Sequence, residues 1–282
     1  MRKVWLAVSA VLAVGLTACG SPSERDAEGG GDNGELTTLR VGATPVPQGD
    51  VLTYVADNLA AEAGLELEVA EYTDYNQPNA ALVEGELEAN YYQHQPFLEE
   101  YLDGDDDADL AYVEDVHLEA FGLYSADLEE AEDLAADAAE GAEVGVPNDA
   151  SNLARALLLL EEQELITLEE DAGELATEGD IVDNPNDLEI TPLEAAQLPR
   201  SLEDLDAAVV NGNYAIETDL AEDASVLAFE DTDGNPYANG LVVNAEDADD
   251  EDIQALDELL HSDEVQEYME ETWDGVVIPT ER

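Results

Sequence analysis

GVPNDASNLARALLLL, residues 145–160, joins a β-branched run to a helical pattern through a polar turn. Val144–Val146 is typical of a short buried strand, and Asn152–Gln163 carries the composition and length of a helix. Arg155 lies in the second turn of this predicted helix. The positions three and four residues away hold Ser151, Asn152, Leu158 and Leu159. A chain with 72 acidic and 7 basic residues therefore places a rare cation where no carboxylate on the same helix can pair with it.

The same strand–turn–helix unit recurs along the chain and predicts an α/β fold with largely parallel sheets. The expected strands are Leu39–Ala43, Leu65–Ala70, Asn90–Gln93, Val116–Tyr124, Val144–Val146, Ala207–Val210, Val226–Phe229 and Gly240–Asn244. The expected helices are Val51–Ala63, Pro78–Glu84, Leu128–Ala138, Asn152–Gln163, Leu193–Leu198 and Ile253–Thr272.

Polar turns follow four of these strands, with the sequences TPVPQGD, HQPF, PNDASN and NGNYA. Ligands of open α/β sheets bind at the carboxyl ends of the strands. The recurrence of Tyr, His, Arg and Asn at these ends therefore predicts a ligand site there.

The N-terminus is typical of a secretory signal. Arg2 and Lys3 precede an apolar run, Val4–Leu16, which is shorter than the ~20 residues of a spanning helix. The following Leu-Thr-Ala-Cys resembles a bacterial lipobox and predicts cleavage before Cys19 and lipid attachment to its sulfur. Residues 1–18 are then a signal peptide, and 19–35 are the lipidated cysteine and a flexible acidic, Gly-rich linker. We expect a lipid-anchored protein on the extracytoplasmic face of the cell membrane; an ordinary signal with a chance cysteine is the alternative.

The formal net charge is −65, and acidic residues occur on every segment. This composition predicts a halophilic acidic protein and excludes nucleic acid as a partner, because a polyanion repels such a surface. Apolar residues make up 45% of the chain, enough for a folded core of one large domain or two lobes. DGDDDADL, residues 103–110, lacks the spacing of a calcium loop, so we expect no metal and no cofactor.

Seven blocks carry a family resemblance: TDYNQPN (73–79), NYYQHQPFL (90–98), VHLEAFGLYS (116–125), PNDASNLARALLLL (147–160), LEAAQLPR (193–200), NGNYA (211–215) and PYANGLVV (236–243). Together they resemble the methionine-binding lipoproteins, the extracytoplasmic substrate-binding components of ABC importers. The resemblance implies a two-lobed, type II periplasmic-binding-protein fold with a cleft between lobes and two crossing segments. Lobe I would comprise 36–122 and 239–282, and lobe II would comprise 123–238. Val46 and Gln48 depart from the family's usual glycine and histidine.

The resemblance also implies a ligand-binding set: Tyr75, Tyr92, His94, Arg155, Asn211, Asn213 and Asn239. A guanidinium can hold a ligand carboxylate through two parallel hydrogen bonds, so Arg155 is assigned to that group. Tyr92 and His94 share one face of a strand, and aromatic rings suit a thioether. Side-chain amides can hold both ends of a zwitterion.

Each assignment has a structural alternative: a distant ion pair for Arg155, a core role for His94, loop packing for Tyr75 and turn chemistry for the asparagines. His117 and His261 are assigned structural roles, His117 facing out of its strand.

The function implied is binding of methionine, L-methionine first, and its delivery to an ABC permease and its ATPase. D-methionine, a methionine-containing dipeptide or another small apolar amino acid remain alternatives, as does a sensor or adhesin without transport. A hydrolase using the same cleft is disfavoured, because the three histidines are scattered and no G-x-S-x-G or H-E-x-x-H motif occurs. We therefore expect no catalytic residue.

Overall fold

Two mixed β-sheets organise the part of the chain described by this computed structural model, residues 36–105, 107–136 and 141–280. All of these residues belong to one unit, Glu35–Arg282. The predicted signal peptide, Cys19 and the predicted linker lie outside the described residues.

The first sheet has six strands in the order β13-β4-β12-β3-β1-β2. They are β1 (Thr37–Ala43), β2 (Leu65–Glu71), β3 (Ala89–His94), β4 (Leu110–Glu119), β12 (Asn239–Asn244) and β13 (Val277–Pro279). β1 runs parallel to β2 and β3, whereas β12 is antiparallel to both β3 and β4, and β13 is antiparallel to β4.

The second sheet has five strands in the order β11-β5-β10-β6-β9. They are β5 (Gly122–Ser125), β6 (Glu143–Pro147), β9 (Glu189–Leu193), β10 (Ala207–Val210) and β11 (Ser225–Phe229). β6 is parallel to β9 and β10, but β5 is antiparallel to β10 and β11. A small antiparallel pair, β7 (Thr167–Leu168) and β8 (Ile181–Asp183), stands apart. The expectation of largely parallel sheets is therefore wrong: both sheets are mixed, because β12 and β13 in the first sheet and β5 in the second run antiparallel to their neighbours.

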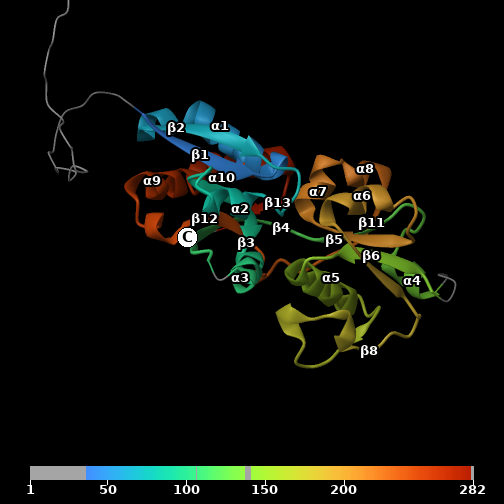
Figure 1. Ribbon diagram of the computed structural model, residues 1–282. Coiled ribbons are helices and arrows are strands. Elements are labelled where there is room, and N and C mark those ends of the chain that lie inside the picture. The colour runs from blue at the N-terminus through green and yellow to red at the C-terminus, as the bar shows by residue number, and fades with distance from the viewer. Residues whose placement is uncertain (1–35, 106, 137–140, 281–282) are drawn as a thin grey trace, which may run out of the picture. The chain divides into compact units, whose positions relative to one another are not determined.

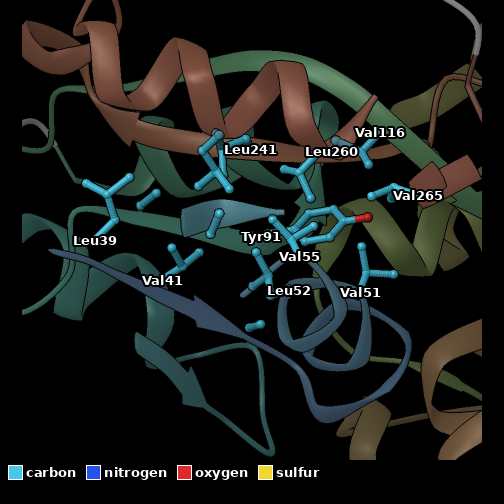
Figure 2. Close-up of a cluster of buried hydrophobic side chains, with 14 of the residues drawn as sticks. Leu39, Val41, Val51, Leu52, Val55, Tyr91, Val116, Leu241, Leu260 and Val265 are labelled. Atoms are coloured by element: carbon cyan, nitrogen blue, oxygen red, sulfur yellow. The ribbon is translucent and has the colours of Figure 1, made fainter. Parts of the chain in front are cut away.

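Helices pack on both faces of the first sheet. α1 (Asp50–Asn58), α9 (Glu251–Leu260) and α10 (Asp263–Trp273) share a core with alternate residues of β1, which are Leu39, Val41 and Ala43. Figure 2 shows Val51, Leu52 and Val55 of α1 gathered with Tyr91 and with Leu260 and Val265. α2 (Pro78–Val83) and α3 (Gln95–Gly104) pack with Val242, which points to the opposite face from Leu241 and Val243.

The second sheet is covered in the same way. α4 (Ala131–Ala136) and α5 (Ala150–Glu162) share a core with Ala207 and Val209 of β10. α6 (Leu198–Ser201), α7 (Gly212–Glu217) and α8 (Leu220–Asp223) pack near Ala208 and Val210, on the other face of that strand (Figure 1). Each fully buried aliphatic side chain in these cores contributes ~1.5–3 kcal/mol of transfer free energy.

Four predicted elements are divided or shifted in the structure. Val51–Ala63 is an α-helix only as far as Asn58, and Ala60–Ala63 is a separate 3-10 helix. Val116–Tyr124 is two strands, β4 and β5, because the chain leaves one sheet after Glu119 and joins the other at Gly122. Leu193–Leu198 is not one α-helix: Leu193 ends β9, Ala195–Gln197 is a short 3-10 helix, and α6 begins at Leu198, where Pro199 suits the first turn because it lacks an N–H. Ile253–Thr272 is two helices, since the Ser262 hydroxyl caps α10 by accepting from the Val265 N–H.

The chain passes between the two sheets twice. The first crossing is the short segment between β4 and β5, and the second runs from the end of β11 at Phe229 to the start of β12 at Asn239. The two crossings are hydrogen-bonded to each other, because the Glu230 N–H donates to the Phe121 carbonyl over 3.1 Å. Residues at these crossings therefore lie beside both sheets.

Candidate functional site

One cavity is lined by all seven residues of the predicted ligand-binding set, which are Tyr75, Tyr92, His94, Arg155, Asn211, Asn213 and Asn239. They come from the turn after β2, the end of β3, α5, the turn into α7 and the start of β12. The space between these side chains is about 330 Å³, part of it open to solvent. Such a volume is within the range of small-molecule sites.

Arg155 is held on α5, whose start is fixed by a cap. The Asp149 carboxylate accepts from the Asn152 N–H at 3.0 Å, so the helix begins at Ala150, two residues earlier than the sequence pattern predicts. The Arg155 side chain is only 3% exposed and lines the cavity.

The guanidinium of Arg155 has a carboxylate partner far along the chain. Its Nε donates to the Glu230 carboxylate at 2.9 and 3.1 Å, and its Nη2 also donates to Glu230. Nη2 donates further to the Glu119 carbonyl at 2.9 Å. Nη1 donates to no group among the described residues. The guanidinium carbon lies 3.8 Å from the ring centre of Phe121 and 4.6 Å from that of Tyr237, a cation–π arrangement.

Glu119 supplies a carboxylate to the same cavity from the end of β4. Its Oε1 accepts from the Gln48 amide at 2.6 Å and contacts His117 Nε2, and His117 Nδ1 is hydrogen-bonded to the Tyr91 hydroxyl. His117 is 0% exposed, so the expectation that it faces outward is wrong; its ring lies in the interior and supports Glu119. The cavity thus has a cation and a carboxylate, each fixed by buried partners.

Asn211 and Asn213 each present an unpaired polar atom. Asn211 Oδ1 and Asn213 Nδ2 are buried and have no hydrogen-bond partner in the described part of the chain. Asn213 Oδ1 is occupied, because it accepts from the Tyr75 hydroxyl at 2.6 Å. Leaving a buried polar group unpaired costs ~1–3 kcal/mol, so one acceptor and one donor beside the cavity indicate a polar ligand.

His94 is neutral in this environment. Burial, followed by the nearby charge of Arg155, lowers the pKa of His94 from 6.5 to about 3. Its Nδ1 accepts from the Phe97 N–H at 3.1 Å and caps α3, which leaves Nε2–H to donate to Asn152 Oδ1 at 3.1 Å. Arg155 is therefore the cation of this cavity, and His94 joins an element of one sheet to a helix of the other.

An aromatic wall closes one side of the cavity. The ring centres of Tyr75, Tyr92 and Phe97 lie 5.8–6.0 Å from one another, in tilted or edge-on contacts. Tyr214 adds a fourth ring 5.1 Å from Tyr75. Such a wall offers apolar and polarisable contact to a ligand side chain, including a sulfur atom.

Further residues line the cavity that the sequence patterns did not single out: Gln93, Phe97, Glu119, Phe121, Asn152 and Gly212. Gln93 was expected on the opposite face from Tyr92. Phe97 could have been found from its place in HQPF, three residues after His94. Glu119 carried no signal, because it is one of many acids and lies in an expected strand interior.

Contacts between elements of the two sheets surround the cavity. The Glu100 carboxylate, on α3, accepts from the Ala150 and Ser151 N–H groups at the start of α5, at 3.0 and 2.9 Å. The Asn76 amide donates to Glu194 at 3.1 Å. Together with the His94–Asn152 bond, these contacts hold the two sides of the cavity together.

The described residues contain no cluster of three or more His, Cys, Asp or Glu that could hold a metal ion. Within residues 36–105, 107–136 and 141–280, no helix is both long and apolar enough to span a membrane.

Two mixed α/β sheets, joined by two crossings and lining one cavity, are consistent with a two-lobed, periplasmic-binding-protein-like fold. Comparison with known proteins gives the particular family. Residues 39–281 match the NlpA lipoprotein family, and the chain belongs to it.

Relatives cover nearly the whole chain. The methionine-binding lipoprotein MetQ of Bacillus subtilis is 35% identical over 283 residues, which is 99% of each chain. The D-methionine-binding lipoprotein MetQ of Salmonella typhimurium is 34% identical over 277 residues, 97% of this chain and 96% of its own. A nutrient-binding protein from Burkholderia cenocepacia, solved bound to methionine, is 37% identical with a TM-score of 0.79; the match covers 86% of this chain and 100% of that one.

Proposed function

We propose that this protein binds a free amino acid, methionine, and delivers it to an ABC permease for uptake. The observation that carries the proposal is the pair of unpaired buried amide atoms, Asn211 Oδ1 and Asn213 Nδ2, beside an arginine and a glutamate. An acceptor and a donor, together with a cation and a carboxylate, complement the ammonium and carboxylate of a zwitterion. No covalent chemistry is required for this role.

The ligand carboxylate accepts from Arg155 Nη1, the guanidinium nitrogen that has no other acceptor in the described chain. Glu119 accepts from the ligand ammonium through the oxygen that neither Gln48 nor His117 contacts. Asn211, Asn213 and Asn239 complete the polar ring around these two groups.

The ligand side chain packs on the aromatic wall of Tyr75, Tyr92 and Phe97. A thioether gains from aromatic contact, which favours methionine over an acidic or cationic side chain. The relatives whose names include methionine, and the methionine-bound structure at 37% identity, support the same ligand. L-methionine is the proposed isomer.

Two lobes are proposed to open and close around the ligand. Lobe I is 36–122 with 239–282, and lobe II is 123–238; the change of sheet between β4 and β5, and between β11 and β12, supports these boundaries. Because the His94–Asn152 hydrogen bond joins the two sides of the cavity, we propose that methionine enters when the two lobes separate at the crossings.

The proposed partners follow from the family and the N-terminus. Lipidation of Cys19 anchors the protein to the extracytoplasmic face of the cell membrane, where it meets a permease and its ATPase. Family membership and the lipobox-like sequence before Cys19 support this location.

Isothermal titration in molar salt tests the proposal. The full chain, purified in detergent and stripped of bound ligand by unfolding and refolding, is titrated with L-methionine, D-methionine, glycyl-methionine and L-leucine. We expect L-methionine to bind most tightly. Tighter binding of D-methionine, the dipeptide or leucine would reassign the ligand, and absence of binding to all four would refute the proposal. Mass spectrometry of the unfolded sample identifies any ligand that copurified.

A further inference from the structure

Behind Arg155 lies a buried carboxylate that does not itself line the cavity. Glu230 directly follows β11, at the start of the second crossing, and its side chain is 8% exposed. Resting on the proposed function, we propose that Glu230 is a positioning residue that sets the charge selectivity of the site. By orienting and neutralising Arg155, it makes the cavity select zwitterions over anions.

Orientation follows from the hydrogen bonds. Glu230 accepts from Nε and Nη2 of Arg155, and its Oε1 also accepts from the Phe121 N–H at 2.8 Å. The orientation of the guanidinium plane is therefore fixed, and the edge formed by Nε and Nη2 is already hydrogen-bonded within the protein. A ligand carboxylate can then receive a hydrogen bond from Nη1, rather than the two parallel bonds expected from the sequence.

Neutralisation follows from burial. Arg155 and Glu230 are 3% and 8% exposed, so solvent screens their charges poorly. His94 is neutral because burial lowers its pKa to about 3. A lone guanidinium in this position would attract small anions such as chloride, whereas the ion pair has no net charge.

Selectivity is the consequence. A monoanion gains from Arg155 but is repelled by the carboxylates of Glu230 and Glu119. A zwitterion has the same carboxylate contact and also places its ammonium beside Glu119, which lines the cavity. The two acidic side chains therefore strengthen binding of a zwitterion and weaken binding of a monoanion, although both ligands offer a carboxylate to Arg155.

The test uses three ligands of one shape and different charge: methionine, its monoanionic analogue 4-(methylthio)butanoate, and methioninamide, a cation. Binding is measured to the full chain and to Glu230→Gln. Loss of one buried negative charge should tighten binding of the anion and weaken binding of methioninamide, each by about tenfold or more. Binding of methionine should change by less than about threefold, because its two charges respond in opposite directions.

Glu222→Gln is the matched control, since Glu222 is an exposed acid on α8 and its removal should leave all three affinities unchanged. Equal weakening of all three ligands by Glu230→Gln would show a purely structural role and overturn the inference. So would a gain for methionine as large as that for the anion, because the ligand carboxylate would then be displacing Glu230.

A measurement on the unaltered protein covers the case in which Glu230→Gln does not fold. Methionine affinity in sodium chloride and in sodium gluconate of equal ionic strength should agree within about twofold, because a neutralised Arg155 does not collect chloride. Strong inhibition by chloride would overturn the inference. Failure of methionine to bind the unaltered protein would instead overturn the proposed function, and with it this inference.

Discussion

Replacing Arg155 by Ala should destabilise the fold, beyond any effect on ligand binding. The change removes the cation that pairs with Glu230 and leaves a carboxylate that is 8% exposed, with the Phe121 N–H as its remaining donor among the residues that the structure describes. Breaking a buried ion pair by removing one partner costs ~3–5 kcal/mol. Loss of the stacking on Phe121 and Tyr237 adds ~1–2 kcal/mol.

Removing both partners should cost less than the sum of the two single changes. Arg155→Ala and Glu230→Ala each leave an isolated buried charge, whereas the double variant leaves none. We expect a favourable coupling free energy of ~2–3 kcal/mol between the two side chains.

Urea unfolding of the full chain in molar salt measures this coupling. The four proteins of the double-mutant cycle are compared by their free energies of unfolding, and Glu222→Ala serves as an exposed acid whose loss should be nearly neutral. If the two single effects add within ~0.5 kcal/mol in the double variant, the pair contributes no coupling and the reasoning is refuted. Ligand assays on Arg155→Ala are interpretable only where the variant is shown to be folded.

Three further predictions concern the walls of the cavity. Glu100→Gln should weaken methionine binding by about tenfold, because it loses a charge-assisted hydrogen bond to the start of α5. The loss should appear as faster methionine dissociation in stopped-flow fluorescence. Glu99→Gln is the exposed control, and equal dissociation rates for the two variants would contradict a role of Glu100 in holding the cavity closed. Burial lowers the pKa of His94 to about 3, so between pH 6.5 and pH 3 the unfolded chain takes up a proton at this ring that the folded protein does not. Above pH 6.5 the ring is neutral in both states, and on acidification below pH 6.5 the free energy of unfolding should fall by about 1 kcal/mol per pH unit. His94→Asn should therefore make the free energy of unfolding depend less steeply on pH over that range, and an unchanged slope would exclude a lowered pKa for His94. Gly212→Ala should cost ~1–3 kcal/mol in thermal unfolding, because a Cβ there would lie 2.5 Å from the Glu119 Cβ at the end of β4. Gly104→Ala, with open space around it, is the control, and matching melting temperatures would count against the tight packing.

Local sequence patterns predicted most of the elements near the site. Ala207–Val210 is the strand β10 with the expected bounds, and the polar turns after three strands supply residues that line one cavity. The fourth turn contributes indirectly, because Gln48 donates to Glu119. Such features depend on periodicity and turn chemistry within a few residues, which a single sequence displays. The two crossings, the mixed strand directions and the break at Ser262 were harder to predict from the sequence. Strand direction depends on which partner arrives from elsewhere in the chain, and the weak Ser262 cap lies within a continuous helical pattern.

Arg155 illustrates the limit. The sequence established that no acid on its own helix could pair with it, and its place after a strand put it among the residues of a ligand site. Only the tertiary structure showed that Glu230, 75 residues further on, occupies two of its nitrogens. Glu119 likewise became part of the site only because the end of β4 lies beside the cavity. Sequence spacing determines which side chains share one element, whereas contacts between elements arise from packing of the whole chain.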